Sequence, residues 1–249
     1  MKQYFKHLSK IEFVVTYACT GRCKHCSEGS HSLCGEMIDP ETCADAVRKI
    51  ANEYDIKTVM AFGGEPLLHP EAVYAIISAA KEMGVPRRQV ITNGSFTNDI
   101  ARMREVVARL QESGVNDLLL SVDAFHQETI PLDVVKSFAK EAKACGIPIR
   151  LQPAWLVSPA DCNMYNNKTR GILESFRDTG IVIGEGNVVF PEGNALEYLA
   201  EYFLEGKPEN PYTEDPCDVK CISFDPNGDV LGANAYKTDI IEIMQNYTP

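Results

Sequence analysis

The sequence predicts an α/β fold built on a parallel sheet, because short β-branched runs alternate with longer helical stretches. The runs recur about every 30 residues, which is the length of one strand–helix–strand unit. Consecutive units of this kind form either an open sheet or a partial barrel, and in both cases ligands bind at the carboxyl ends of the strands. The 249 residues fit one large domain, or one domain with a small appendage.

The alternation is clearest in the first part of the chain, where helix start and stop signals separate the strands. Asp39 is a candidate N-cap with Pro40 at the first helical position, and Gly84, Gly114 and Gly146 are candidate helix ends. The expected strands are Ile11–Tyr17, Lys57–Phe62, Gln89–Thr92, Asp117–Val122 and Ile147–Gln152.

The alternation weakens after the fifth strand. Residues 165–179 are expected to form a helix, and "IVIGEGNVVF" one or two strands. The segment "EGKPENPYTEDPCDVKC" is rich in proline and acidic residues, which is typical of a linker. "CISFDPNGDVLGA" then predicts a β-hairpin with a type I′ turn at Asn227-Gly228. We therefore expect a barrel over residues 1–205 and a small extension over residues 206–249.

Composition argues against several classes of protein. A net charge of −11 disfavours binding to nucleic acid or to an anionic membrane. No apolar run approaches the roughly 20 residues of a membrane span. Glu12 interrupts the first apolar run, and no small-residue cleavage site follows, so a secretory signal is not expected. Nine cysteines, an odd number, favour a cytoplasmic protein with metal-binding or redox cysteines over a disulfide scaffold.

Three cysteines gather in "CTGRCKHC", directly after the first strand: Cys19, Cys23 and Cys26. Thiolates select zinc or iron–sulfur clusters. A closed zinc site usually takes four ligands, whereas this triplet has no matching pair nearby. Three thiolates can instead hold three irons of a [4Fe–4S] cluster and leave the fourth iron open. Zinc with His25 or His31 as fourth ligand is the alternative.

The second strand ends in "FGGEP", which contains Gly63, Gly64 and Glu65. Two glycines let a ligand approach the backbone closely, and Glu65 offers an acceptor for a cation such as an ammonium group. An ordinary tight turn between strand and helix is the alternative.

Polar side chains also follow the other strands, and they are expected at the same edge of the sheet. Period-two alternation places Arg150 and Gln152 on one face of the fifth strand. If that face lines the barrel interior, Arg150 can meet a carboxylate; if it faces solvent, Arg150 is a solvated charge. The remaining candidates are Asn93 in "ITNGS", and Ser121, Asp123 and His126 in "SVDAFH".

The cysteine triplet, "GGEP", "TNG" and "SVD", in this order and spacing, resemble the core of the radical S-adenosylmethionine enzymes. The resemblance covers about residues 11–155 and implies a partial (βα)6 barrel. The family often has an aromatic residue before the third cysteine, a place that His25 takes here.

The resemblance also implies roles for the candidate residues. The three cysteines would ligate a [4Fe–4S] cluster whose open iron binds the amino and carboxylate groups of S-adenosylmethionine. Glu65 and the Gly63–Gly64 backbone would hold the amino group. The ribose and carboxylate would be contacted by Ser121, Asn93 and Asp123, with Arg150 on the carboxylate and Gln152 lining the cavity.

The implied reaction is reductive cleavage of S-adenosylmethionine to a 5′-deoxyadenosyl radical, which takes hydrogen from a peptide, protein or small-molecule substrate. A one-electron donor such as flavodoxin or ferredoxin would supply the electron. His126 is a candidate acid–base group or substrate contact, or alternatively a buried capping residue. Other possibilities are a glycyl-radical activating enzyme, a zinc-binding interaction module, and a non-catalytic iron–sulfur carrier or sensor, which needs no adenosine-sized cavity.

The C-terminal segment resembles the end of SPASM-type radical enzymes, which carry auxiliary iron–sulfur clusters there. Cys217 and Cys221 fit part of that pattern, but Gly232 stands where those proteins usually place a further cysteine. We therefore expect a degenerate extension without a cluster, although a second cluster remains an alternative. The first strand begins almost at once, so we expect no leader-peptide-binding module in this chain.

Overall fold

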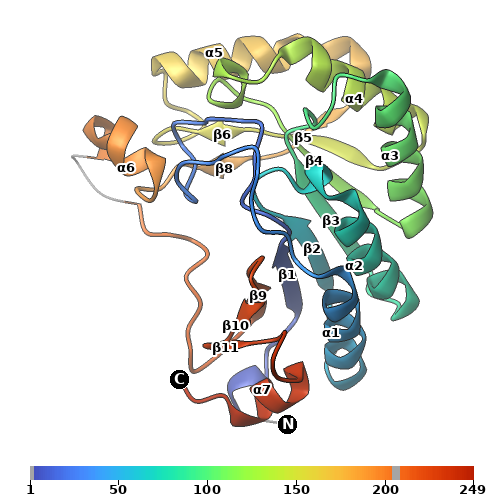
Figure 1. The fold of residues 1–249 in the computed structure, drawn as a ribbon. Helices are drawn as coiled ribbons and strands as arrows, with labels where there is room; N and C mark the ends of the chain where they lie inside the picture. Colours follow the sequence, from blue (N-terminus) through green and yellow to red (C-terminus); the bar gives the residue numbers. More distant parts are fainter. Residues whose placement is uncertain (1–2, 204–207) are drawn as a thin grey trace.

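The computed structural model describes residues 3–203 and 208–249, and in these ranges a curved parallel sheet of seven strands forms the centre (Figure 1). The strand order is β7-β5-β4-β3-β2-β1-β9. The strands are β1 Lys10–Val14, β2 Thr58–Phe62, β3 Arg87–Thr92, β4 Asp117–Ser121, β5 Ile149–Gln152, β7 Val182–Ile183 and β9 Cys221–Phe224. The predicted α/β class and the partial barrel are confirmed.

Helices follow the first four strands and cover the outer face of the sheet (Figure 1). The Asp39 carboxylate accepts a hydrogen bond from the Thr42 amide at 2.7 Å, as the predicted N-cap requires. Gly114 ends its helix in the left-handed region, with φ of 99°. The helices are α1 Pro40–Glu53, α2 Pro70–Glu82, α3 Ile100–Ser113, α4 Leu132–Ala144, α5 Met164–Glu174, α6 Asn194–Tyr198 and α7 Ile240–Asn246.

A second, two-stranded sheet lies above the carboxyl end of β5. β6 (Ala154–Trp155) pairs in parallel with β8 (Asn187–Val188). The two strands predicted in "IVIGEGNVVF" are therefore β7 and β8. The predicted helix over residues 165–179 is α5 followed by a short 3-10 turn at Arg177–Thr179.

The C-terminal segment differs from the prediction in its strand pairing. β9 does not form a hairpin with the next strand but joins the main sheet in parallel with β1, where Ile222 pairs with Ile11. A type I′ turn needs positive φ at both central residues, and Asn227 lacks it. The hairpin lies further on, between β10 (Asp229–Val230) and β11 (Ala233–Asn234), with both turn residues at positive φ.

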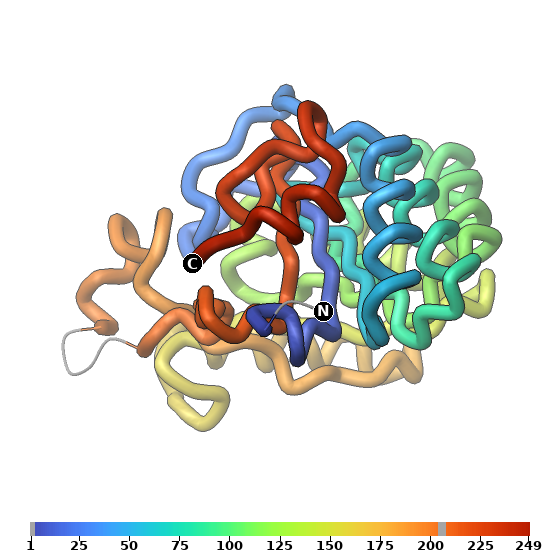
Figure 2. Tube along the Cα trace, turned by 90° about the horizontal axis from the view of Figure 1, so that it is seen from below, coloured from blue at the N-terminus to red at the C-terminus, as the bar shows by residue number. Residues whose placement is uncertain are grey.

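The segment after β9 packs beside the first strand and helix of the barrel (Figure 2). α7 contacts α1, and Lys49 of α1 forms an ion pair with Asp239 at the start of α7. The division into residues 1–205 and 206–249 stays a prediction. Within the described ranges, no helix combines the length and apolar character that crossing a bilayer would require.

Candidate metal centre

The loop after β1 is fixed to the turn after β2 by backbone hydrogen bonds. The Gly64 amide donates to Thr16 O and the Glu65 amide to Ala18 O, each at 2.8 Å. Gly63 has φ of 134°, and a Cβ on Gly64 would lie 2.2 Å from Ala18 O. The two glycines therefore allow the turn to approach the cysteine loop itself.

The three predicted metal-binding cysteines line one cavity, with a volume of about 110 Å³. Cys19 and Cys23 are buried, Cys26 is partly buried, and none of the three forms a disulfide. Gly21 also lines this cavity, and a Cβ there would lie 3.2 Å from the Cys23 sulfur and 3.6 Å from the Cys19 sulfur. The glycine keeps open the space that the sulfurs surround.

The spacing of these sulfurs tests what they can hold. A zinc–sulfur bond is about 2.3 Å long, so two sulfurs on one ion lie at most about 4.6 Å apart. Cys19, Cys23 and Cys26 do not form a set with all sulfurs within 4.8 Å of one another. As they stand, the three sulfurs do not lie close enough together to bind one ion as a set.

Burial also sets the protonation of the three thiols. Burial raises the pKa of Cys19, that of Cys23 strongly, and that of Cys26 to about 11. Without a metal these groups are neutral thiols near pH 7 and therefore poor nucleophiles. A bound metal would replace their protons.

Polar side chains surround the sulfurs. The Asn93 amide donates to the Cys19 sulfur at 3.6 Å, and Nε2 of His31 lies 3.1 Å from the Cys26 sulfur. Nδ1 of His31 lies 2.7 Å from the Tyr17 carbonyl oxygen. Asn93, predicted to contact S-adenosylmethionine, lines the cavity and also contacts a candidate ligand.

Asn194, at the start of α6, is a positioning residue that the sequence did not reveal. Its side-chain amide donates to Cys23 O at 3.0 Å, and its backbone amide to Cys26 O at 2.9 Å. A Cβ on the preceding Gly193 would lie 2.3 Å from Ser27 O. In the sequence, only the Gly193-Asn194 pair marks this position. Such a pair does not indicate a contact with the cysteine loop, which is far away in sequence.

Glu65 is fully buried and is bound by donors of the chain itself. Its carboxylate accepts from the Leu67 amide at 3.0 Å, the Thr92 hydroxyl at 2.7 Å and the Asn93 amide at 2.8 Å. Burial raises the pKa of Glu65 to about 7, against the effect of these hydrogen bonds. Glu65 thus links the turn after β2 to the end of β3 and does not line the cysteine cavity, so its predicted ammonium contact stays a prediction.

Asp123 and His126 form a buried pair after β4. The Asp123 carboxylate accepts from Nδ1 of His126 at 2.8 Å, from the Phe125 and His126 amides at 2.9 Å, and from the Ala154 amide at 3.0 Å. Burial opposes both charges, but the attraction between them prevails: the pKa of Asp123 lies well below its usual range and that of His126 is raised. Asp123 therefore orients His126, whose ring lines the cysteine cavity.

A second cavity, of about 220 Å³, adjoins the first. Both are lined by His126, Ser121 and Gly63, and the second also by Asp123 and Gln152. Together they reach the low end of the range of small-molecule sites, roughly 300–1,000 Å³. The structure therefore brings most of the predicted site residues to one place.

Arg150, like Glu65, lies outside both cavities. Its guanidinium makes two hydrogen bonds of 3.0 Å to Asp117, the first residue of β4, and it lines neither cavity. Asp117 lies at the amino end of its strand, whereas the cysteine loop lies at the carboxyl ends. Arg150 does share the face of β5 from which Gln152 lines the second cavity, but its guanidinium is bound at the amino end of that face, so its contact with a cofactor carboxylate stays a prediction.

Cys217 and Cys221 are also remote from the cavities. Cys221 pairs with Lys10, the first residue of β1, and therefore lies at the amino end of the sheet. Neither cysteine lines the two cavities, and the degenerate extension without a cluster stays a prediction.

Comparison with known proteins identifies the family. A sequence model described as the Radical SAM superfamily matches residues 13–150. A protein of Sulfolobus acidocaldarius named probable GTP 3′,8-cyclase is 29% identical over 157 residues, covering 59% of this chain and 47% of its own. One of Saccharolobus islandicus with the same name is 25% identical over 216 residues, covering 80% and 66%. This chain spans about half the length of the first of these relatives.

Solved structures agree with the fold. SuiB from Streptococcus suis, bound to S-adenosylmethionine, has a TM-score of 0.60 at 13% identity, covering 97% of this chain and 66% of its own. The structure of anSMEcpe with AdoMet and the Kp18Cys peptide has a TM-score of 0.58 at 14% identity, covering 96% and 80%. With the family match over more than half of its residues, this chain belongs to the Radical SAM superfamily.

Proposed function

We propose that this chain cleaves S-adenosylmethionine reductively and uses the resulting radical to take a hydrogen atom from an organic substrate. Members of the superfamily use a [4Fe–4S] cluster and S-adenosylmethionine. The single observation that carries the proposal is the continuity of two cavities, one lined by the three cysteines and the next by Ser121, His126 and Gln152. An electron carrier or sensor does not need the second cavity.

The cluster and S-adenosylmethionine, when bound, supply the electron and the 5′-deoxyadenosyl radical. The residues of the chain hold and shield them. Cys19, Cys23 and Cys26 provide three thiolate ligands, and the Gly63–Gly64 backbone, which lines the cavity, is the proposed partner of the amino group.

The second cavity is the proposed place of the adenosine and the substrate. Ser121 and Gln152 offer hydrogen bonds there, and the Asp123 carboxylate, against the effect of burial, raises the pKa of His126 and so favours the ring form with a proton on Nε2 as well as on Nδ1. A proton held at Nε2 can be donated to a substrate oxygen or nitrogen. This is the functional role that we propose for His126.

The cavity lining also bears on the substrate. No lysine or arginine is among the described residues that line either cavity. Triphosphates are usually bound through such cations or through a metal ion. We therefore do not extend GTP cyclisation to this chain, and propose a small molecule or peptide side chain without phosphates. Activation of a glycyl radical on a partner protein is the alternative within the same chemistry, and flavodoxin or ferredoxin is the proposed electron donor.

Anaerobic reconstitution with iron and sulfide tests the proposal. We expect about four irons per chain, and release of 5′-deoxyadenosine after addition of dithionite and S-adenosylmethionine. Cys23→Ala should abolish the release, whereas Cys34→Ala, at an exposed cysteine outside the cavity, should not. A full complement of four irons without any 5′-deoxyadenosine would instead favour an electron carrier.

A further inference from the structure

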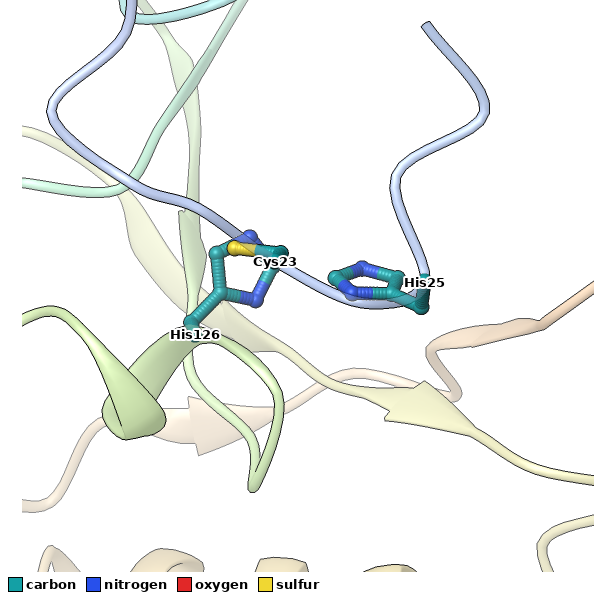
Figure 3. Close-up of side chains that lie close together, drawn as sticks. All are labelled: Cys23, His25 and His126. Atoms are coloured by element: carbon teal, nitrogen blue, oxygen red, sulfur yellow. The ribbon is translucent and has the colours of Figure 1, made fainter. Parts of the chain in front are cut away.

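We propose that Cys23, His25 and His126 form a second metal site, which holds a single Zn²⁺ ion when the cluster is absent. The proposal concerns the metal-free chain and does not depend on the radical reaction. Each of the three residues offers one ligand atom, and these atoms all lie within 4.8 Å of one another. Figure 3 shows Cys23 and His25 on the loop after β1, with His126 facing them from the segment after β4.

The three ligand atoms are near enough for one ion to bind all of them. With zinc–sulfur bonds of about 2.3 Å and zinc–nitrogen bonds of about 2.0–2.1 Å, ligand atoms around a tetrahedral zinc lie about 3.3–3.6 Å apart. From separations of up to 4.8 Å, side-chain shifts of up to about 1 Å would close the site. Their chemistry also fits, because thiolate and imidazole are the preferred ligands of zinc, and three protein ligands leave one position for water.

The surroundings of His126 are those of a zinc ligand. Its Nδ1 contacts the Asp123 carboxylate at 2.8 Å, which leaves Nε2 free to bind a metal. A carboxylate behind a histidine in this way fixes the ring and makes the ligand more basic. Asp123 is in turn held by three backbone amides, so the ring is positioned before any ion arrives.

A second observation, independent of the spacing, comes from His25 and indicates that its ring lacks a binding partner. Its Nδ1 is buried and has no hydrogen-bond partner among the described residues. The ring packs between Phe125, with centroids 4.8 Å apart, and His126, at 4.9 Å. A buried nitrogen without a partner is costly, and a zinc ion bound at Nδ1 itself would remove that cost.

The ion and the cluster exclude each other, because both need Cys23. Cys19 and Cys26 are not part of the three-ligand set, so the two sites share a single residue. Zinc bound here would delay assembly of the cluster, and iron–sulfur assembly would release the zinc.

A titration with Co²⁺ tests the site. The whole chain is first stripped of metal and reduced under anaerobic conditions, and Co²⁺ is then added. We expect one Co²⁺ per chain, with thiolate charge-transfer and tetrahedral d–d absorption, and its displacement by Zn²⁺. His25→Phe and His126→Gln should each weaken binding by at least the 10- to 100-fold that loss of an outer-shell partner costs. Cys19→Ser and Cys26→Ser should leave Co²⁺ binding within about threefold of the wild-type value.

His31→Gln is the matched histidine control, because His31 lies in the same loop region but contacts Cys26. Loss of Co²⁺ binding in His31→Gln or Cys26→Ser, with retention in His25→Phe and His126→Gln, would overturn the proposal. So would binding that persists in Cys23→Ser. His25→Phe should still take up about four irons. If it takes up none, its fold is damaged, and His126→Gln then decides the question.

Discussion

Replacement of Asp123 by asparagine should destabilise the chain, although it keeps the size of the side chain. In the wild type, one carboxylate oxygen accepts from Nδ1 of His126 and the Ala154 amide, and the other from the amides of Phe125 and His126. An asparagine amide group in place of the first oxygen cannot accept hydrogen bonds. The Nδ1–H group of His126 and the amide of Ala154 would then point at the asparagine NH2 group, which is itself a donor.

The magnitude follows from these contacts. Each buried donor left without a partner costs about 1–3 kcal/mol, and His126 can avoid its share by losing the Nδ1 proton. We therefore expect a loss of about 3 kcal/mol in the free energy of unfolding, of the size measured when buried ion pairs are broken. At roughly 2–4 °C per kcal/mol for a chain of this length, the melting temperature should fall by roughly 6–12 °C.

Urea denaturation of the metal-free, reduced chain, followed by circular dichroism, measures this loss. His126→Gln breaks the same pair from the other side and leaves the buried carboxylate with its three backbone amides. It should therefore also cost about 3 kcal/mol. An Asp123→Asn variant within about 1 kcal/mol of the wild type would refute the reasoning.

Four further outcomes follow from the structure. Gly64→Ala should lower the iron content after reconstitution severalfold, because its Cβ would lie 2.2 Å from Ala18 O in the cysteine loop. Arg150→Met should change S-adenosylmethionine affinity, measured by calorimetry, less than about threefold, since Arg150 pairs with Asp117 outside the cavities; a tenfold loss would restore its predicted role. Cys221→Ser should leave the count at about four irons, and a drop from about eight to four would reveal a second cluster. Because burial raises the pKa of Glu65 from 4.5 to about 7, the folded chain binds this proton more tightly than the unfolded chain. The protonated Glu65 side chain therefore stabilises the folded chain fully below pH 4.5. This contribution to the free energy of unfolding falls by about 3 kcal/mol as the pH rises to 7. Urea denaturation across this range should show that Glu65→Gln removes the fall.

Features set by local sequence were predicted correctly. Alternation of apolar runs and helix caps placed the strands and helices of the first half, and Asp39 caps its helix as expected. The cysteine triplet and the polar residues after β2, β3 and β4 converge because parallel strands end at the same edge of a sheet.

Features set by tertiary partners were not predictable in this way. The position of β9 depends on pairing with β1, more than two hundred residues earlier, so its local pattern suggested a hairpin instead. Period-two alternation placed Arg150 and Gln152 on one face, but it could not show that Asp117 binds the guanidinium at the amino end of the strands. Likewise, no local signal links Asn194 to the cysteine loop.

These tertiary contacts fix the shape of the cysteine loop. The turn after β2 binds the loop at Thr16 and Ala18, and Asn194 binds it at Cys23 and Cys26. A loop held from two sides loses little further conformational freedom when it binds a metal, so less of the binding energy is spent on ordering it. The same rigidity holds Cys23 and His25 beside His126, and so both the cluster and the competing ion would meet preorganised ligands. Relaxing the loop, for instance with Asn194→Ala, should therefore weaken both sites together, in contrast to His25→Phe, which should affect only the single ion.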